Sequence, residues 1–291
     1  MNAPEKNRLL PDVQSSADVR GIEIGAVGVR GLRYPIKVRS GGRVAATVAQ
    51  WAMTVTVPAA VKGTHMSRFV ELLQAQSDAL DAAGFRALFR DMLDRLNAQA
   101  GTIEMRFPWF VEKTAPVSGV RSLLDHDVQW RASASARGQQ SLWLKAVVPV
   151  TSLCPCSREI SVYGAHNQRS HVAIEVEALE PIEVEDLIAI AERSSSCEVY
   201  GLLKRADEKY VTERAYENPK FVEDMVRDVA VALNQERRVG AYTVEVENFE
   251  SIHNHSAFAR IARPAGGLWK CRSSMRLAAE RVQCLAGLVG A

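Results

Sequence analysis

The first part of the chain alternates between apolar and polar residues, at first with the spacing of strands and then with that of helices. Residues 32–38 alternate, and residues 45–57 are rich in β-branched side chains, which predicts two antiparallel strands. Apolar side chains then recur at helical spacing over 66–73 and 85–96, which predicts two helices with one buried face each. Alternation returns over 102–111. The predicted order is therefore strand, strand, helix, helix, strand.

The second half of the chain repeats this order without evident sequence identity to the first. A further strand near Val120 completes the first series, and Pro219 suits the first turn of a helix in the second. The predicted strands of the second series are 128–136, 142–150, 172–176 and 242–247, and its predicted helices are 184–193 and 219–236. Two such series predict an α+β protein in which each antiparallel sheet carries a pair of helices on one face.

These patterns divide the chain into four segments. Residues 1–20 are polar and predict a flexible N-terminal arm. Residues 21–125 hold the first series of elements, and residues 126–263 hold the second series together with the candidate metal site. Residues 264–291 form a more apolar C-terminal extension, which is either a docking helix or an unrelated addition.

The composition is that of a globular protein. The 291 residues are 47% hydrophobic and 24% charged, and the formal net charge is only +2. No overall field therefore attracts nucleic acid or an anionic membrane, and no apolar run reaches the roughly 20 residues of a membrane span. Five cysteines, an odd number spread thinly, do not indicate a disulfide framework, and the N-terminus resembles no secretory signal. We expect a reduced, cytoplasmic protein.

Candidate chemistry lies in residues 150–170 (VTSLCPCSREISVYGAHNQRS). Cys154 and His166 carry a thiol and an imidazole, the side chains that bind a borderline-soft cation such as Zn²⁺. Pro155 lacks an amide proton and disfavours helical geometry at Cys154, so the segment predicts a turn or strand end that presents the sulfur. It is therefore a candidate metal site.

The same segment resembles the signature of type IB GTP cyclohydrolase I, a metal-dependent family. The matching blocks are TSLCPCS at 151–157, GAHNQRS at 164–170, GTHMSRF at 63–69 and SIHNH at 251–255. The resemblance extends from about residue 12 to residue 260, with the blocks in the family's order. One departure follows His255, where this chain has Ser256 and the family pattern usually continues with Asp.

The resemblance implies a fold, an assembly and an activity. The fold would consist of two tunnelling-fold modules per subunit, whose sheets assemble into a barrel. The assembly would be a homotetramer with its sites at subunit interfaces. The activity would be the hydrolysis of GTP to 7,8-dihydroneopterin triphosphate and formate by a metal-activated water, which is the first step of tetrahydrofolate and pterin biosynthesis.

The resemblance also implies a ligand set for a divalent metal. The corresponding residues are Cys154, His166, Glu208 and His253. One thiolate, two imidazoles and a carboxylate suit Zn²⁺ or Mn²⁺. Residue types alone would leave Glu208 on a solvated surface, because it lies in the charged run 204–209. His253 and His255 flank Asn254 and would point to the same side of an extended chain.

Catalysis is assigned to three residues through the same resemblance. Cys154 would hold the metal as a thiolate, and a histidine would protonate N7 of the purine so that the imidazole ring can open. Either His65 or His255 can carry that proton, because an imidazole donates and accepts near neutral pH.

Side chains must hold the substrate, because the sequence has no phosphate-binding loop of the GxxxxGK[ST] type. Lys62 and Arg68 flank a predicted helix N-terminus that favours anions, and the guanidinium of Arg169 suits bidentate phosphate contact. The family's purine anchor is a glutamate near the start of the module's second helix, which corresponds to Glu223. Its carboxylate would accept both N–H groups of the guanine edge.

Three alternative functions share these features. Some archaeal relatives make a dihydroneopterin cyclic phosphate, and the signature does not separate the two products. The wider fold includes a nitrile reductase of queuosine synthesis, which uses a cysteine nucleophile and NADPH in place of a catalytic metal. A metal-stapled structural module would have a closed four-ligand site and no chelator-reversible activity. Metal content and product distinguish these alternatives.

Overall fold

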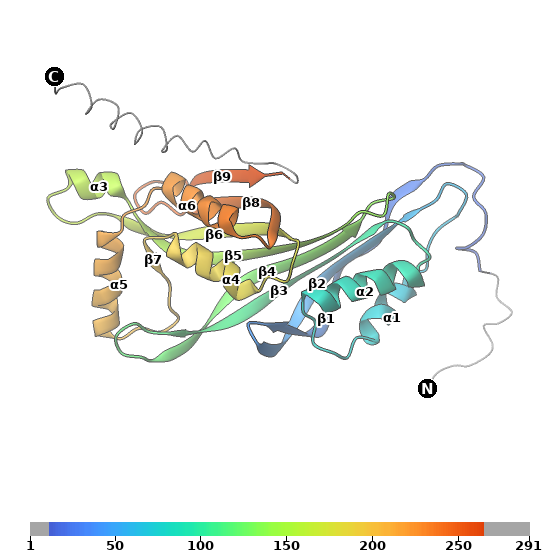
Figure 1. Ribbon diagram of the computed structural model, residues 1–291, viewed down its shortest axis with the longest axis horizontal. Coiled ribbons are helices and arrows are strands. Elements are labelled where there is room, and N and C mark those ends of the chain that lie inside the picture. The colour runs from blue at the N-terminus through green and yellow to red at the C-terminus, as the bar shows by residue number, and fades with distance from the viewer. Residues whose placement is uncertain (1–11, 265–291) are drawn as a thin grey trace, which may run out of the picture.

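The computed structural model describes residues 12–264, and its elements form two successive series (Figure 1). The first series consists of β1 (Ile24–Ser40), β2 (Arg43–Val57), α1 (Ser67–Gln74), α2 (Ala82–Arg95), β3 (Gly101–Thr114) and β4 (Arg121–Ala134). The second consists of β5 (Gln140–Leu153), α3 (Pro155–Ile160), β6 (Asn167–Ala178), α4 (Val184–Arg193), β7 (Cys197–Glu198), α5 (Arg205–Glu217), α6 (Val222–Gln235), β8 (Val239–Asn248) and β9 (Ala257–Arg263). The predicted α+β class is confirmed.

All nine strands of the described residues belong to one sheet. Eight follow one another in the order β1-β2-β3-β4-β5-β6-β8-β9, and the short β7 pairs with β5. The pairings between these strands are antiparallel throughout. Among the described strands, β1 and β9 are therefore the outermost.

One hydrophobic core lies beneath both helix pairs. Strand β2 buries Trp51, Met53 and Val55, and α2 adds Phe85 to the same cluster. The Phe85 ring centroid lies 6.3 Å from that of Trp51 and 5.6 Å from that of Trp130 in β4. Helices α4 and α6 pack onto β5, β6, β8 and β9, and their buried residues belong to this cluster too. The predicted helix pairs therefore share a core that spans the whole sheet.

The face of the sheet opposite the helices is more exposed and carries a row of polar side chains. Gln50, Arg106, Gln129 and Lys145 are cross-strand neighbours on four successive strands. None of the four is buried, whereas the residues that alternate with them along these strands are. Alternation along each strand thus separates a core face from a polar face, as period-two patterning requires.

Strand β4 corrects one part of the sequence prediction. The pattern predicts a strand near Val120 and another over 128–136, whereas the structure has a single strand from Arg121 to Ala134. The whole of this strand pairs with β3, and its second half also pairs with β5. The predicted boundary between the modules, between residues 125 and 126, lies inside it, so the two series share one sheet.

Other elements escape the sequence prediction because their patterns are weak or short. Helix α5 has no apolar stripe and buries only Asp207 and Ala215, so helical periodicity does not mark it. The six-residue α3, the two-residue β7 and the outermost β9 are likewise new. Helix α6 begins at Val222 rather than at Pro219.

The described part of the predicted N-terminal arm is hydrogen-bonded to the loop after β2. The amide of Asp18 donates to the carbonyl of Ala60, and the amide of Lys62 donates to the carbonyl of Ser16, each over 3.0 Å. Residues 1–11 and most of the predicted C-terminal extension, 265–291, lie outside the described residues. None of the described helices is both long and apolar enough to span a membrane.

Candidate active site

Several signature residues lie at one end of the sheet. Strand β5 ends opposite the start of β6, and β8 ends opposite both β6 and the start of β9. This register places Cys154, just after β5, beside His166, just before β6. The loop 249–256, between β8 and β9, leaves the same end of the sheet, where α3 and α5 also lie (Figure 1).

Cys154 and His166 are joined through their backbones and through one serine. The Cys154 amide donates to the His166 carbonyl over 3.1 Å, and the His166 amide donates to Ser157 Oγ over 3.2 Å. Ser157 Oγ donates in turn to the Cys154 carbonyl over 3.2 Å, and the Ser157 amide donates to Cys154 Sγ over 3.4 Å. Cys154 is thus the N-cap of α3 with Pro155 in its first turn, which confirms the predicted strand end.

The His166 ring is held by a buried polar network. Its Nδ1 lies 3.0 Å from Gln168 Oε1, and Gln168 Nε2 donates to Ser152 Oγ over 2.6 Å. Ser170 Oγ also donates to Ser152 Oγ, over 2.9 Å. Gln168, Ser152 and Ser170 are all buried.

The sequence analysis assigned no role to the three polar residues of this network. They stand at alternating positions that continue the buried series of Val172 and Ile174 back along β6 and across to β5. This continued alternation could have predicted a buried polar network, because a polar residue on the core face requires a hydrogen-bond partner.

The remaining predicted metal ligands lie on other segments. Glu208 is exposed in the first turn of α5, and His253 is exposed in the loop 249–256. The rings of His253 and His255 stack with centroids 5.1 Å apart, so they do point to the same side. Within residues 12–264, no group of three or more His, Cys, Asp or Glu side chains is arranged to hold a metal ion.

The donor pair Cys154–His166 fits a borderline-soft divalent cation. Its thiol and imidazole are the right donor types, and the Nδ1 contact leaves Nε2 of His166 available as a ligand. Nearby, Asn248 pairs across the sheet with Ser170 and buries its Oδ1 without a hydrogen-bond partner among the described residues. That oxygen is an acceptor that a bound group can satisfy. The structure thus brings two of the four predicted ligands together.

The predicted purine anchor lies near the same end. Glu223 is exposed in the first turn of α6. The Lys220 amide donates to the Leu153 carbonyl over 3.0 Å, which ties the start of α6 to the residue before Cys154. Arg169 is exposed in β6, and its carbonyl accepts from the Phe249 amide over 3.0 Å.

The predicted residues of the first series lie elsewhere. Lys62, His65 and Arg68 stand at or just before the start of α1, and α1 and α3 lie toward opposite ends of the molecule (Figure 1). His65 Nε2 lies 3.2 Å from Asp12 Oδ2, and Arg68 Nη1 donates to the carbonyl of Arg95 over 2.8 Å. Within a single chain, these residues therefore lie far from Cys154.

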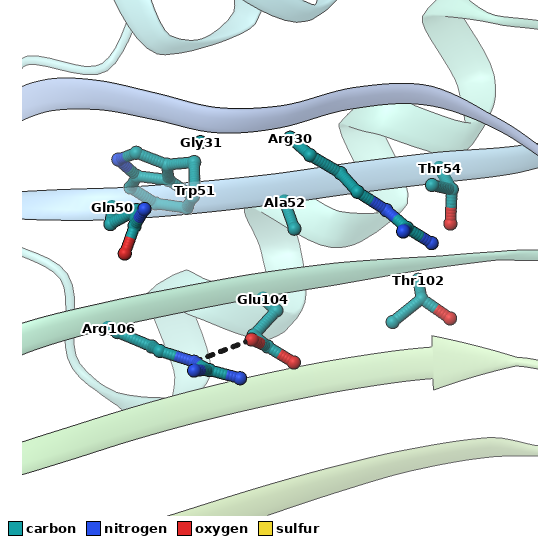
Figure 2. Close-up of a pocket in the computed structure, with 9 residues that line it drawn as sticks. All are labelled: Arg30, Gly31, Gln50, Trp51, Ala52, Thr54, Thr102, Glu104 and Arg106. Carbon is teal, nitrogen blue, oxygen red and sulfur yellow. Dashed lines mark hydrogen bonds and ion pairs between the residues drawn. The ribbon is translucent and has the colours of Figure 1, made fainter.

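Two of the larger hollows lie on the polar face of the sheet, away from all predicted site residues. One, of about 490 Å³, is lined by Arg30, Gln50, Ala52, Thr54, Thr102, Glu104, Arg106 and two neighbours. Figure 2 shows the Arg30 side chain extending along the sheet toward Thr54, while Arg106 pairs with Glu104 over 2.8 Å. A second, of about 560 Å³, includes Arg33 and Lys145. The sequence analysis named none of these residues.

Comparison with solved structures defines the class of protein. Uricase from Arthrobacter globiformis superposes with a TM-score of 0.50 at 8% identity, covering 84% of this chain and 96% of that chain. A hyper-thermostable mutant of that uricase gives a TM-score of 0.51 at 8% identity, covering 84% and 93%. At this identity the likeness shows the fold alone, which is the tunnelling fold.

The family follows from sequence comparison. Residues 10–259 match the family described as type I GTP cyclohydrolase folE2. The chain is 59% identical over 262 residues to GTP cyclohydrolase FolE2 of Paraburkholderia phymatum, covering 90% of this chain and 97% of that protein. It is 56% identical over 262 residues to GTP cyclohydrolase FolE2 1 of Dechloromonas aromatica, covering 90% and 98%. The chain therefore belongs to the type I GTP cyclohydrolase folE2 family, as its signature blocks predict.

Proposed function

We propose that the protein is an enzyme that hydrolyses GTP to 7,8-dihydroneopterin triphosphate and formate, the first step of tetrahydrofolate and pterin biosynthesis. The family match over residues 10–259 carries this proposal. The joined pair of Cys154 and His166 supports it, because this pair provides a thiol and an imidazole at one end of the sheet. A cytoplasmic location would keep the thiol reduced.

A divalent metal, Zn²⁺ or Mn²⁺, is part of the proposal. Cys154 and His166 would form its fixed half, with Glu208 and His253 supplied by α5 and the loop 249–256. When bound, such an ion supplies Lewis-acid activation of water near neutral pH. The stacked rings of His253 and His255 support a division of roles, with His253 as ligand and His255 as a proton carrier. His65 would be the second proton-carrying imidazole of the site.

The chain's own charged groups would bind and orient GTP. Glu223 would accept from the two N–H groups of the guanine edge, a charge-assisted pair of hydrogen bonds. Lys62, Arg68 and Arg169 would hold the triphosphate. The Arg68 guanidinium already bonds the Arg95 carbonyl through Nη1, which leaves its other N–H groups to reach an anion.

A second copy of the chain would complete the site. Lys62, His65 and Arg68 lie toward the end of the molecule opposite Cys154, so one site can use both groups only if they come from different chains (Figure 1). The outermost strands β1 and β9 offer backbone hydrogen-bonding groups for pairing between copies. We propose a homotetramer in which such pairing closes the sheets into a barrel.

The first experiment is turnover of GTP by metal-depleted protein supplied with Mn²⁺ or Zn²⁺. Formate release and fluorescence of the oxidised pterin should both appear with metal. The mass of the product separates the linear triphosphate from a cyclic phosphate. If neither metal gives formate, the proposed activity is wrong.

Cys154→Ala should abolish formate release without unfolding the protein. The matched control is Cys156→Ala, because Cys156 is exposed two residues further on and makes no hydrogen bond through its sulfur among the described contacts. We expect the control to retain most of its turnover and its metal. Turnover by Cys154→Ala at the wild-type rate would contradict the metal role.

A further inference from the structure

We propose that Gln168 is a positioning residue that fixes the tautomer and orientation of the His166 ring. In this arrangement Gln168 Oε1 accepts a hydrogen bond from His166 Nδ1–H, so that the lone pair on His166 Nε2 would be available to a metal ion. The inference rests on the proposed metal site, but the state of the ring can be measured without any metal.

The network that holds Gln168 is built by the strand register. Ser152 of β5 pairs directly with Gln168 of β6, and Ser170 stands two residues further along the same face. His166 is two residues before Gln168 on that face. The two-residue period thus places His166, Gln168 and Ser170 in a row, and the cross-strand pair places Ser152 beside Gln168.

Burial makes the arrangement rigid. Gln168 is 7% exposed, and Ser152 and Ser170 are fully buried. Each end of the Gln168 amide has a partner, with Oε1 at 3.0 Å from His166 Nδ1 and Nε2 at 2.6 Å from Ser152 Oγ. Turning the amide away would leave buried polar atoms without hydrogen-bond partners, which is unfavourable.

This rigidity has a chemical consequence for His166. A neutral imidazole has one N–H and one lone pair, and the partner of one nitrogen decides what the other can do. A carbonyl oxygen can only accept, so it selects the Nδ1–H form. Ligating histidines commonly donate their second N–H to such an acceptor, and loss of the acceptor typically weakens metal binding about 10–100-fold.

The tautomer is the first test. Long-range ¹H–¹⁵N spectra of the metal-free wild-type protein, with the His166 signals identified by their loss in His166→Gln, report which nitrogen carries the proton. We expect Nδ1–H. A proton on Nε2 of His166 would mean that Gln168 turns its own NH₂ group, and not its oxygen, toward the ring. That result would overturn the proposal.

Metal affinity is the second test. Competition with a chelator should show Zn²⁺ binding about 10–100-fold weaker in Gln168→Leu, and binding restored to within a few-fold in Gln168→Glu, which keeps an acceptor at the same place. Equal affinities in wild type and Gln168→Leu would overturn the proposal. If Gln168→Leu does not fold, the proposal is still tested by the His166 tautomer in the wild-type protein and by the Zn²⁺ affinity of Gln168→Glu.

The two proposals can fail separately. A wild-type protein that shows Nδ1–H but binds neither Zn²⁺ nor Mn²⁺ would remove the metal site and leave the positioning role of Gln168 intact. A protein that binds metal but carries the proton on His166 Nε2 would keep the metal site and remove the positioning role of Gln168.

Discussion

Ser157 connects the two residues on which the proposed metal site depends. Its hydroxyl accepts from the His166 amide and donates to the Cys154 carbonyl, and its amide donates to Cys154 Sγ. One small side chain thus fixes the backbone of both donors before any ion arrives. Preorganisation of this kind reduces the ordering cost of binding.

His126 shows how burial alone changes a titratable side chain away from this site. It lies in β4 and is 1% exposed. Burial, reinforced by the nearby Lys113 cation, lowers the pKa of His126 from 6.5 to about 4. Asp125 and Glu185 act in the opposite direction without offsetting this shift. His126 is therefore neutral in the folded protein at neutral pH.

We predict that His126 makes the fold acid-sensitive. Below pH 6.5 the unfolded chain binds a proton that the folded chain does not bind, so stability is complete above pH 6.5 and declines as the pH falls toward about 4. The total loss approaches about 3 kcal/mol, at about 1.4 kcal/mol for each pKa unit.

Urea unfolding at about pH 7 and about pH 4.5 measures this dependence. His126→Gln should remove the part of the difference between the two free energies of unfolding that comes from His126. The exposed His255 provides the control, because His255→Gln should leave the difference unchanged. The prediction is wrong if His126→Gln and wild type lose stability equally on acidification.

At the scale of elements, the start of helix α5 is held by one buried carboxylate. Asp207 Oδ1 accepts from the amides of Val117 and Ser118, each over 2.8 Å, and Oδ2 accepts from Ser118 Oγ over 2.6 Å and from the Lys204 amide over 2.9 Å. Burial by itself would raise the pKa of Asp207, but these hydrogen bonds outweigh it and lower the pKa. The carboxylate thus joins the start of α5 to the turn between β3 and β4.

We predict that Asp207→Ala releases the start of α5. The variant should unfold several degrees below wild type, because two amides and a hydroxyl lose their acceptor and the helix loses its cap. Thermal unfolding measures the shift. Glu213→Ala is the control on the same helix. Within residues 12–264, Glu213 forms only an exposed ion pair with Lys209, so this substitution should change the midpoint little.

Because Glu208 follows Asp207 directly, the same substitution should weaken Zn²⁺ binding more than Glu213→Ala does. An Asp207→Ala protein with wild-type unfolding temperature and wild-type metal affinity would show that α5 is held by other contacts. A lower unfolding temperature with unchanged Zn²⁺ affinity would show that Glu208 does not act as a metal ligand.

The sequence predicts those elements whose burial is periodic. Strands β2 and β5 and helices α2 and α4 bury one regular face, so period two or period 3.6 reveals them. The start of helix α5 is fixed by four hydrogen bonds of Asp207, but from the sequence Asp207 is one more charged residue in a charged run. Such contacts join segments far apart in sequence, which periodicity does not record.

The candidate site also contains residues that local sequence patterns bring together and residues that they do not. Cys154 and His166 could be predicted as a pair because a short motif carries both, and the register of β5 and β6 brings them together. The positions of Glu208 and His253 depend on α5 and on the loop 249–256, and neither has a strong local pattern. Their role as ligands stays a prediction.

At the scale of the whole molecule, the predicted site residues fall into two groups at opposite ends. The group beside α1 holds Lys62, His65 and Arg68, and the group beside α3 holds Cys154 and His166 (Figure 1). A continuous sheet separates the two groups, so rearrangement of side chains does not bring them together. If both groups serve one site, they belong to different copies of the chain.

We predict that two inactive variants restore each other's activity when they assemble together. His65→Ala and Cys154→Ala should each be inactive alone. In a randomly mixed oligomer, a site between chains is intact when one chain supplies His65 and its neighbour supplies Cys154, so co-expression in equal amounts should recover about a quarter of wild-type activity. The matched control co-expresses wild type with the double variant, and it should also give about a quarter. A site within one chain would instead give no activity in the first mixture and about half in the second.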